Sequence, residues 1–237
     1  MSPSSSRARP LKGEASKVYK LFKSGDDGNF KVAMSLIDTV LDGLEVLLDD
    51  LHVTDDGQIK SGKRFEGNDK NQHHLNALLM ALVAASPSEQ AQDLREQTKV
   101  IKITTAAIPA LSAFPNLEEA TLYIGVESVV ENLEAFGSTP KLKSLSLYGQ
   151  AVPFNSGKKS AQLKSLKGLD APNLISLTAT GVKLLDINGL EGCSKLLDLT
   201  LQRNQELASI DPVSKIAPSL VNVNLAGSLA IESLTPL

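Results

Sequence analysis

Short leucine-bearing segments recur in the second part of the chain. Each follows the pattern LxxLxL, whose last positions alternate between apolar and other residues as in a half-buried strand. The clear copies begin at Leu117, Leu142, Leu174, Leu196 and Leu220, at intervals of 25, 32, 22 and 24 residues, and Ile101 begins an earlier, degenerate copy. Apolar residues at steps of three follow each copy. The pattern predicts about six short strands of one repeated unit, over residues 98–237.

Residues 13–97 have a helical periodicity instead. Apolar residues at spacings of three and four from Ala33 to Leu51 predict one amphipathic helix with an acidic, solvated face. Shorter helices are expected at 14–23, 71–85 and from Ser88 to Gln97, where Ser86 or Ser88 can cap the start. Residues 52–71 are polar and punctuated by glycine, which indicates a loop or a loop with a small hairpin. Residues 1–12 are rich in Ser, Pro and Arg and are expected to be disordered.

The repeated unit resembles that of leucine-rich-repeat proteins. A single LxxLxL unit cannot bury its apolar edge, whereas stacked units build a continuous leucine ladder. The resemblance covers residues 98–237 and implies an α/β solenoid with short parallel strands on its concave face. The helices of residues 13–97 resemble the HEAT-like segment that precedes such repeats in some bacterial cytoplasmic proteins. A plain helical cap over the first repeat is an equally compatible interpretation.

The chain also departs from that family pattern. The asparagine that the family places three residues after the last strand leucine, where it satisfies backbone groups of the turn, is present at Asn204. Gly125, Gln150, Val182 and Ser228 occupy the equivalent positions, so less regular turns are expected. The last repeat carries no polar cap. Its apolar end, with Leu234 and Leu237, implies a partner, a second copy of the chain or a longer protein.

Composition narrows the chemistry. The 237 residues include 38 Leu but only 4% aromatic residues and no Trp, as expected for a repetitive core, and the net charge is −3. The single cysteine, Cys193, excludes an internal disulfide and a Cys-rich zinc site, and is expected to be a packed residue. Gly57–Arg64 has the spacing of a phosphate-binding loop, but Arg64 stands where the motif needs Ser or Thr. We therefore expect no enzyme, cofactor or metal, with a nucleotide site at Gly57–Arg64 as the alternative.

The remaining signal is a surface. Residues between and after the strand leucines face outward on the concave side of the expected sheet. Tyr123 and Tyr148 are neighbours there, and tyrosine is enriched in binding hot spots; the alternative is an ordinary exposed cross-strand pair. The predicted partner-binding residues are Glu119, Thr121, Tyr123, Ser146, Tyr148, Thr178, Thr180, Asp198, Thr200, Gln202, Asn222 and Asn224.

A basic stretch lies between Leu133 and Asp170, where Glu134 is the only acid. It could meet an acidic partner or a phosphate backbone, or form a solvated face. Its lysines are Lys141, Lys143, Lys158, Lys159, Lys164 and Lys167. The lack of interleaved arginine and aromatic residues argues against nucleic acid.

These features together predict a non-catalytic protein–protein interaction module that binds a protein partner through the concave face. The alternative is a structural or assembly protein that forms homo-oligomers through Leu234 and Leu237. No apolar run is long enough to span a bilayer and the N-terminus lacks a secretory signal, so a cytoplasmic protein without membrane association is expected.

Overall fold

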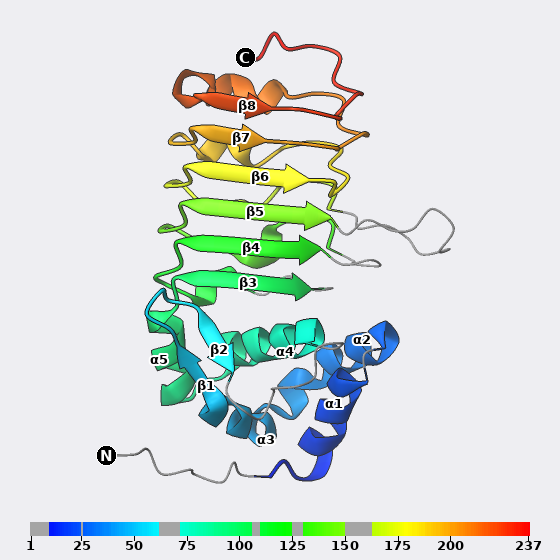
Figure 1. Cartoon of the computed structure of the whole chain (residues 1–237), viewed down its shortest axis with the longest axis vertical. Helices are drawn as coiled ribbons and strands as arrows, with labels where there is room; N and C mark the ends of the chain where they lie inside the picture. The colour runs from blue at the N-terminus through cyan, green and yellow to red at the C-terminus, as the bar shows by residue number, and fades with distance from the viewer. Residues whose placement is uncertain (1–9, 25, 62–71, 106–109, 125–129, 150–162) are drawn as a thin grey trace.

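The computed structural model describes residues 10–24, 26–61, 72–105, 110–124, 130–149 and 163–237. The fold is α/β: helices at the N-terminal end stand against the first strand of a six-stranded parallel sheet (Figure 1). No helix in these ranges has the length and apolar character needed to cross a membrane.

The sheet forms at the repeated segments, as predicted. Its order follows the sequence, from β3 through β4, β5, β6 and β7 to β8, and every neighbouring pair is parallel. Equivalent positions of the repeat pair with one another, as in Leu122 with Leu147 and Leu145 with Leu177. The strands are β3 Val100–Thr105, β4 Glu119–Ile124, β5 Ser144–Gly149, β6 Ser176–Thr180, β7 Asp198–Thr200 and β8 Asn222–Asn224.

Short 3-10 helices lie in the connections that return the chain to the start of the next strand. They are η5 Leu111–Ala113, η6 Glu134–Phe136, η7 Leu190–Gly192, η8 Asp211–Lys215 and η9 Ala217–Ser219. The apolar residues at steps of three occupy these returns, and Leu166, Ile187 and Leu190 are fully buried. They pack against strand residues such as Leu147 and Leu177 in one continuous core. The leucine ladder therefore lies between the sheet and the returns.

Asn204 is the one predicted turn asparagine, and it is fully buried. Its Nδ2 donates to the carbonyl oxygens of Ala179 (2.9 Å) and Gln202 (3.2 Å), and its Oδ1 accepts from the Leu184 N–H at 3.3 Å. In the next repeat Ser228 takes the equivalent place, since its Oγ donates to the Leu201 carbonyl at 2.6 Å. These side chains satisfy backbone groups that would otherwise be buried without partners.

The N-terminal helices are α1 Gly13–Lys23, α2 Asp27–Leu36, α3 Leu41–Leu44, α4 Gln72–Ala85 and α5 Glu89–Gln97. The helices expected at 14–23, 71–85 and 88–97 are confirmed. Ser88 caps α5, because its side chain accepts from the Ala91 N–H. The hairpin is also confirmed: β1 Leu51–Val53 pairs antiparallel with β2 Ile59–Ser61.

The single helix expected between Ala33 and Leu51 is wrong. The segment is divided among the end of α2, η1 Ile37–Thr39, α3 and η2 Glu45–Asp50. Val40 leaves the helical region, with φ −125° and ψ 13°, and the Thr39 hydroxyl bonds back to the Leu36 carbonyl. Three β-branched residues lie between positions 37 and 40, and their restricted side chains disfavour an uninterrupted helix. The apolar pattern still gives a buried face.

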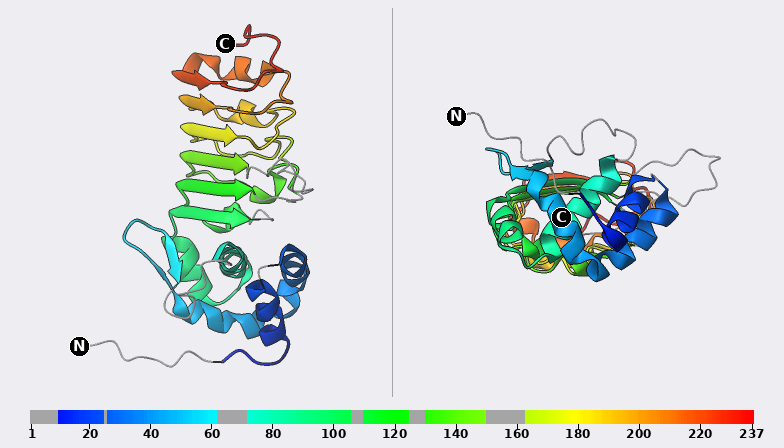
Figure 2. Two further views of the ribbon diagram at one scale, coloured as in Figure 1. Left: turned by 45° about the vertical axis from the view of Figure 1, so that its right-hand side comes forward. Right: turned by 90° about the horizontal axis from the view of Figure 1, so that it is seen from below.

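The two ends of the sheet differ. At the β3 end, α4 packs against the strand (Figures 1 and 2). Ile101 and Ile103 of β3 are buried there. At the β8 end, Val223 is 36% exposed and Leu229 is 85% exposed. Beyond β8 the described chain continues as residues 225–237, which form no helix or strand and leave these side chains exposed (Figure 1).

Candidate partner-binding face of the sheet

Tyr123 and Tyr148 form a stacked pair on the open face of the sheet. They are register partners on β4 and β5, with ring centroids 5.4 Å apart and planes inclined by 23°. Neighbouring strands lie about 4.8 Å apart, so in-register tyrosines are held at stacking distance by the backbone. Tyr123 is 44% exposed. The pair therefore presents one continuous aromatic surface to solvent.

The structure brings the predicted partner-binding residues together. Eleven of the twelve lie on β4 to β8, in register and on the same side of the sheet, because alternate residues of a strand share a face. Gln202 lies two residues after the end of β7. All twelve are at least partly exposed. Around the tyrosines the face consists mainly of hydroxyl and amide groups, and the Asn222 Nδ2 donates to the Asp198 carboxylate at 2.6 Å.

The described lysines of the basic stretch all have partners one repeat earlier. Lys143 pairs with Glu118 and Lys164 with Glu131, each at 2.6 Å, and Lys167 pairs with Glu134 at 2.8 Å. The Lys141 ammonium donates to the Asn116 side-chain oxygen at 2.6 Å. Lys158 and Lys159 lie outside the described residues. Glu134 is the one acid within the stretch and pairs with Lys167, whereas Glu118 and Glu131 come from the chain before it.

These contacts move the pKa values of the groups involved. The Lys143 hydrogen bond, and then its charge, lowers the pKa of Glu118, and Lys167 lowers the pKa of Glu134 in the same way. The hydrogen bond from Lys167 to Glu134 in turn raises the pKa of Lys167. All these groups are exposed, so solvent screens their interaction. Partner binding by these lysines stays a prediction.

Sequence reasoning missed an apolar row beside this face. Ile175, Leu197 and Val221 occupy the second position of three successive LxxLxL units and are 39%, 40% and 72% exposed. The Leu197 N–H donates to the Ile175 carbonyl and the Val221 N–H to the Leu197 carbonyl, so the three are adjacent. The sequence contains a signal for this row, because the second position of the repeat changes from charged residues, Glu118 and Lys143, to apolar ones in the later units. Leu234 and Leu237, near the end of the chain, are also exposed, at 59% and 51%.

Cys193 and the described part of the Gly57–Arg64 segment take part in the packing and hydrogen bonding of the fold. Cys193 is buried, and burial, followed by the charges of Asp170 and Glu191, raises the pKa of its thiol to about 11. In the Gly57–Arg64 segment, the Gly57 carbonyl accepts from the Lys99 and Val100 N–H groups, and residues 62–64 lie outside the described residues. In the described ranges, no three His, Cys, Asp or Glu side chains gather where they could hold a metal ion.

No family model, curated protein or solved structure matches this chain.

Proposed function

We propose that residues 98–237 form a leucine-rich-repeat solenoid whose first repeat is capped by the helices of residues 13–97. We further propose that the chain is a non-catalytic module that binds a protein partner through the concave face of the sheet. The strand order, the equivalence of paired positions and the buried leucine layer support the first part. The resemblance of a repeat architecture to binding proteins is an analogy, so the second part depends on the face itself.

The stacked Tyr123–Tyr148 pair is the observation that carries the proposed function. Aromatic side chains dominate the energetics of many interfaces because they bury a large area with little loss of conformational freedom. Here the rings are already held in one arrangement by in-register strands, which lowers the entropy lost on binding. The surrounding Thr121, Ser146 and Thr178 provide hydroxyl groups that both donate and accept, as in the polar rim of an interface.

Affinity capture with the wild-type chain and a Tyr123→Ala/Tyr148→Ala variant tests this function. Loss of a hot spot weakens binding by about 2 kcal/mol or more, which corresponds to about thirty-fold in Kd. We expect partners that the wild type retains to be lost from the double variant. An Ile175→Ala/Leu197→Ala variant is the matched control, since these residues have similar exposure but lie in the row outside the tyrosine face. Equal recovery by wild type and tyrosine variant would contradict the assignment.

A second candidate function, assembly through the β8 end, is supported by a separate observation. Val221, Leu229, Leu234 and Leu237 expose 72%, 85%, 59% and 51% of their surfaces near one end of the sheet. Exposed apolar groups gathered in this way mark association surfaces. Sedimentation velocity over a hundred-fold concentration range should show a larger species in the wild type that a Leu229→Glu/Leu234→Glu variant lacks. A wild-type monomer at every concentration would end this candidate.

A further inference from the structure

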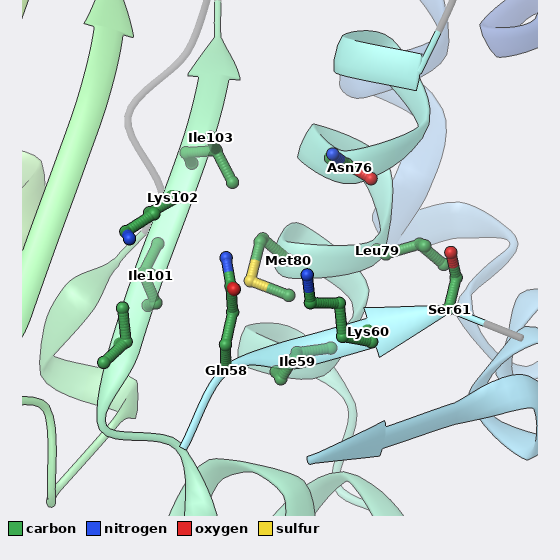
Figure 3. A pocket seen from close by; sticks show the side chains of 11 residues that line it. Gln58, Ile59, Lys60, Ser61, Asn76, Leu79, Met80, Ile101, Lys102 and Ile103 are labelled. Carbon is green, nitrogen blue, oxygen red and sulfur yellow. The ribbon is translucent and has the colours of Figure 1, made fainter. Parts of the chain in front are cut away.

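A cavity of about 250 Å³ lies where the hairpin meets the sheet, between β2, β3 and α4. Figure 3 shows the side chains of Gln58, Lys60 and Met80 in the space between the two strands. Its lining residues are Gln58, Ile59, Lys60, Ser61, Asn76, Leu79, Met80, Val100, Ile101, Lys102 and Ile103. The cavity is separate from the tyrosine pair and belongs to the first, edge strand of the sheet.

The cavity opens where two strands separate. At its closed end, Gln58 and Val100 form a parallel bridge, and the Gly57 carbonyl accepts from the Val100 N–H at 3.1 Å. Beyond this bridge, β2 and β3 share no further pairing among the described residues. β2 and β3 therefore form a wedge that narrows at Gln58.

The unpaired edge of β3 faces this wedge. Backbone groups of a parallel strand point alternately to its two neighbours. Because Val100 points toward the hairpin, Lys102 points the same way, while Ile101 and Ile103 pair with β4. Within the described ranges, no backbone group pairs with the N–H or C=O of Lys102 on this side. An exposed edge of this kind is a template for a further strand.

The wedge combines apolar, basic and neutral polar side chains, the last being Gln58, Ser61 and Asn76. Leu79, Met80, Ile101 and Ile103 are at most 6% exposed and form an apolar floor. Lys60 and Lys102 are exposed, and in the described part of the chain neither ammonium group has a hydrogen bond or ion pair. Among the described residues, no carboxylate lines the cavity.

The size and chemistry of the cavity select among ligands. Pockets that enclose drug-sized molecules measure roughly 300–1,000 Å³, so a cavity of about 250 Å³ can enclose only part of a larger ligand. An extended peptide matches the lining, because its side chains alternate between two faces. One face can place an apolar side chain on the floor while its backbone bonds to the strand edge. The opposite face of the peptide can direct a carboxylate toward Lys60 and Lys102.

We propose that this wedge binds an extended, acidic segment of a partner protein, which adds to the sheet as a strand beside β3. Backbone hydrogen bonds to Lys102 provide affinity, and the apolar floor together with Lys60 and Lys102 selects alternating apolar and acidic residues. The site adjoins the concave face, since Lys102 is the register partner of Thr121, so the two surfaces can contact neighbouring parts of one partner.

Titration of the full-length chain with three synthetic peptides tests the proposal. The first is acetyl-Glu-Val-Glu-Val-Glu-amide, the second has Lys in place of Glu, and the third is a fully N-methylated copy of the first. We expect the acidic peptide to bind at least ten-fold more tightly than the other two in calorimetry. Hydrogen exchange of the Lys102 amide should slow when it binds, because that N–H gains an acceptor.

Variants separate this site from others. Lys60→Glu/Lys102→Glu should reverse the preference, so that the lysine peptide binds better than the acidic one. Lys143→Glu, a lysine already paired with Glu118 away from the wedge, should leave the preference unchanged, as should Tyr123→Ala/Tyr148→Ala. The proposal is overturned if the acidic peptide does not bind at 1 mM, if the N-methylated copy binds equally well, or if charge reversal at the wedge changes nothing.

Discussion

The two ends of the sheet are built from the same repeat pattern but present opposite surfaces. At the β3 end, Leu78 and Leu82 of α4 are fully buried, and the strand residues Ile101 and Ile103 are covered. At the β8 end, Val223 occupies the equivalent inward position but is 36% exposed, and Leu229 is 85% exposed. The sequence at each end is apolar. The two ends differ in whether a layer of helices packs on the terminal strand, as α4 does on β3.

This difference shows how burial arises in a stacked fold. An inward leucine is sealed only when the repeats on both of its sides are present, as for Leu147 and Leu177, which are fully buried. Stability in such a structure is approximately a sum of each unit and its contacts with the next. The covered end and the interior therefore carry more stabilisation per residue than the bare end. Matched substitutions at the two ends test this difference in stabilisation.

The largest effect is expected at the covered end. Leu78→Ala removes a fully buried side chain where α4 lies next to β3, and such truncations cost about 2–5 kcal/mol. Leu229→Ala at the bare end removes the same atoms from a side chain that is 85% exposed, and surface changes stay within about 0.5 kcal/mol. Urea denaturation of both variants measures the difference. Similar losses at the two positions would contradict the contrast between the ends.

A smaller change in the free energy of unfolding is expected from the buried thiol of Cys193. The pKa of Cys193 is raised from its ordinary value of 9.0 to about 11. Between these pH values the unfolded chain releases the thiol proton while the folded chain retains it, so the free energy of unfolding falls as pH rises. At 1.36 kcal/mol per pH unit, the wild type should lose about 2 kcal/mol between pH 8.5 and 11 that Cys193→Ala does not lose.

Urea denaturation of wild type and Cys193→Ala at several pH values gives that difference directly. The other groups that titrate in this range are common to both proteins and cancel. Parallel stability curves would show that the thiol is open to solvent, and that the interior repeat is no better sealed than the β8 end.

Much of this architecture follows from the sequence. The LxxLxL units predict all six strands and their shared register, because a period of two and a repeated length leave few alternatives. The cap at Ser88 and the hairpin of β1 and β2 follow from local turn and capping chemistry. The break in the helix near Val40 could not be predicted in this way, because the apolar spacing continues through it while the backbone departs from the helix.

The candidate sites divide in the same way. The tyrosine pair is predictable, because it requires only the strand period and the alignment of two repeats. The lysine contacts are not: Lys143 meets Glu118 across 25 positions of sequence, so a local charge count misses the partner. The wedge beside β3 is less visible still. It depends on where the hairpin turns away from the strand, and nothing in the residues of β2 specifies that angle.

The smallest effect is expected from the exposed ion pair at the start of β4 and β5. Both side chains of Lys143 and Glu118 are more than one-third exposed, so water and salt weaken their attraction. Because the pKa of Glu118 is lowered, the contribution of the pair exists above the ordinary carboxyl pKa and is lost as pH falls. A double-mutant cycle with Lys143→Met and Glu118→Gln should give a coupling close to the error of urea denaturation, and 1 M NaCl should leave wild-type stability nearly unchanged. A coupling comparable to the effect of Leu78→Ala would show that surface charges, and not the sealing of leucines by neighbouring repeats, distinguish the interior from the bare end.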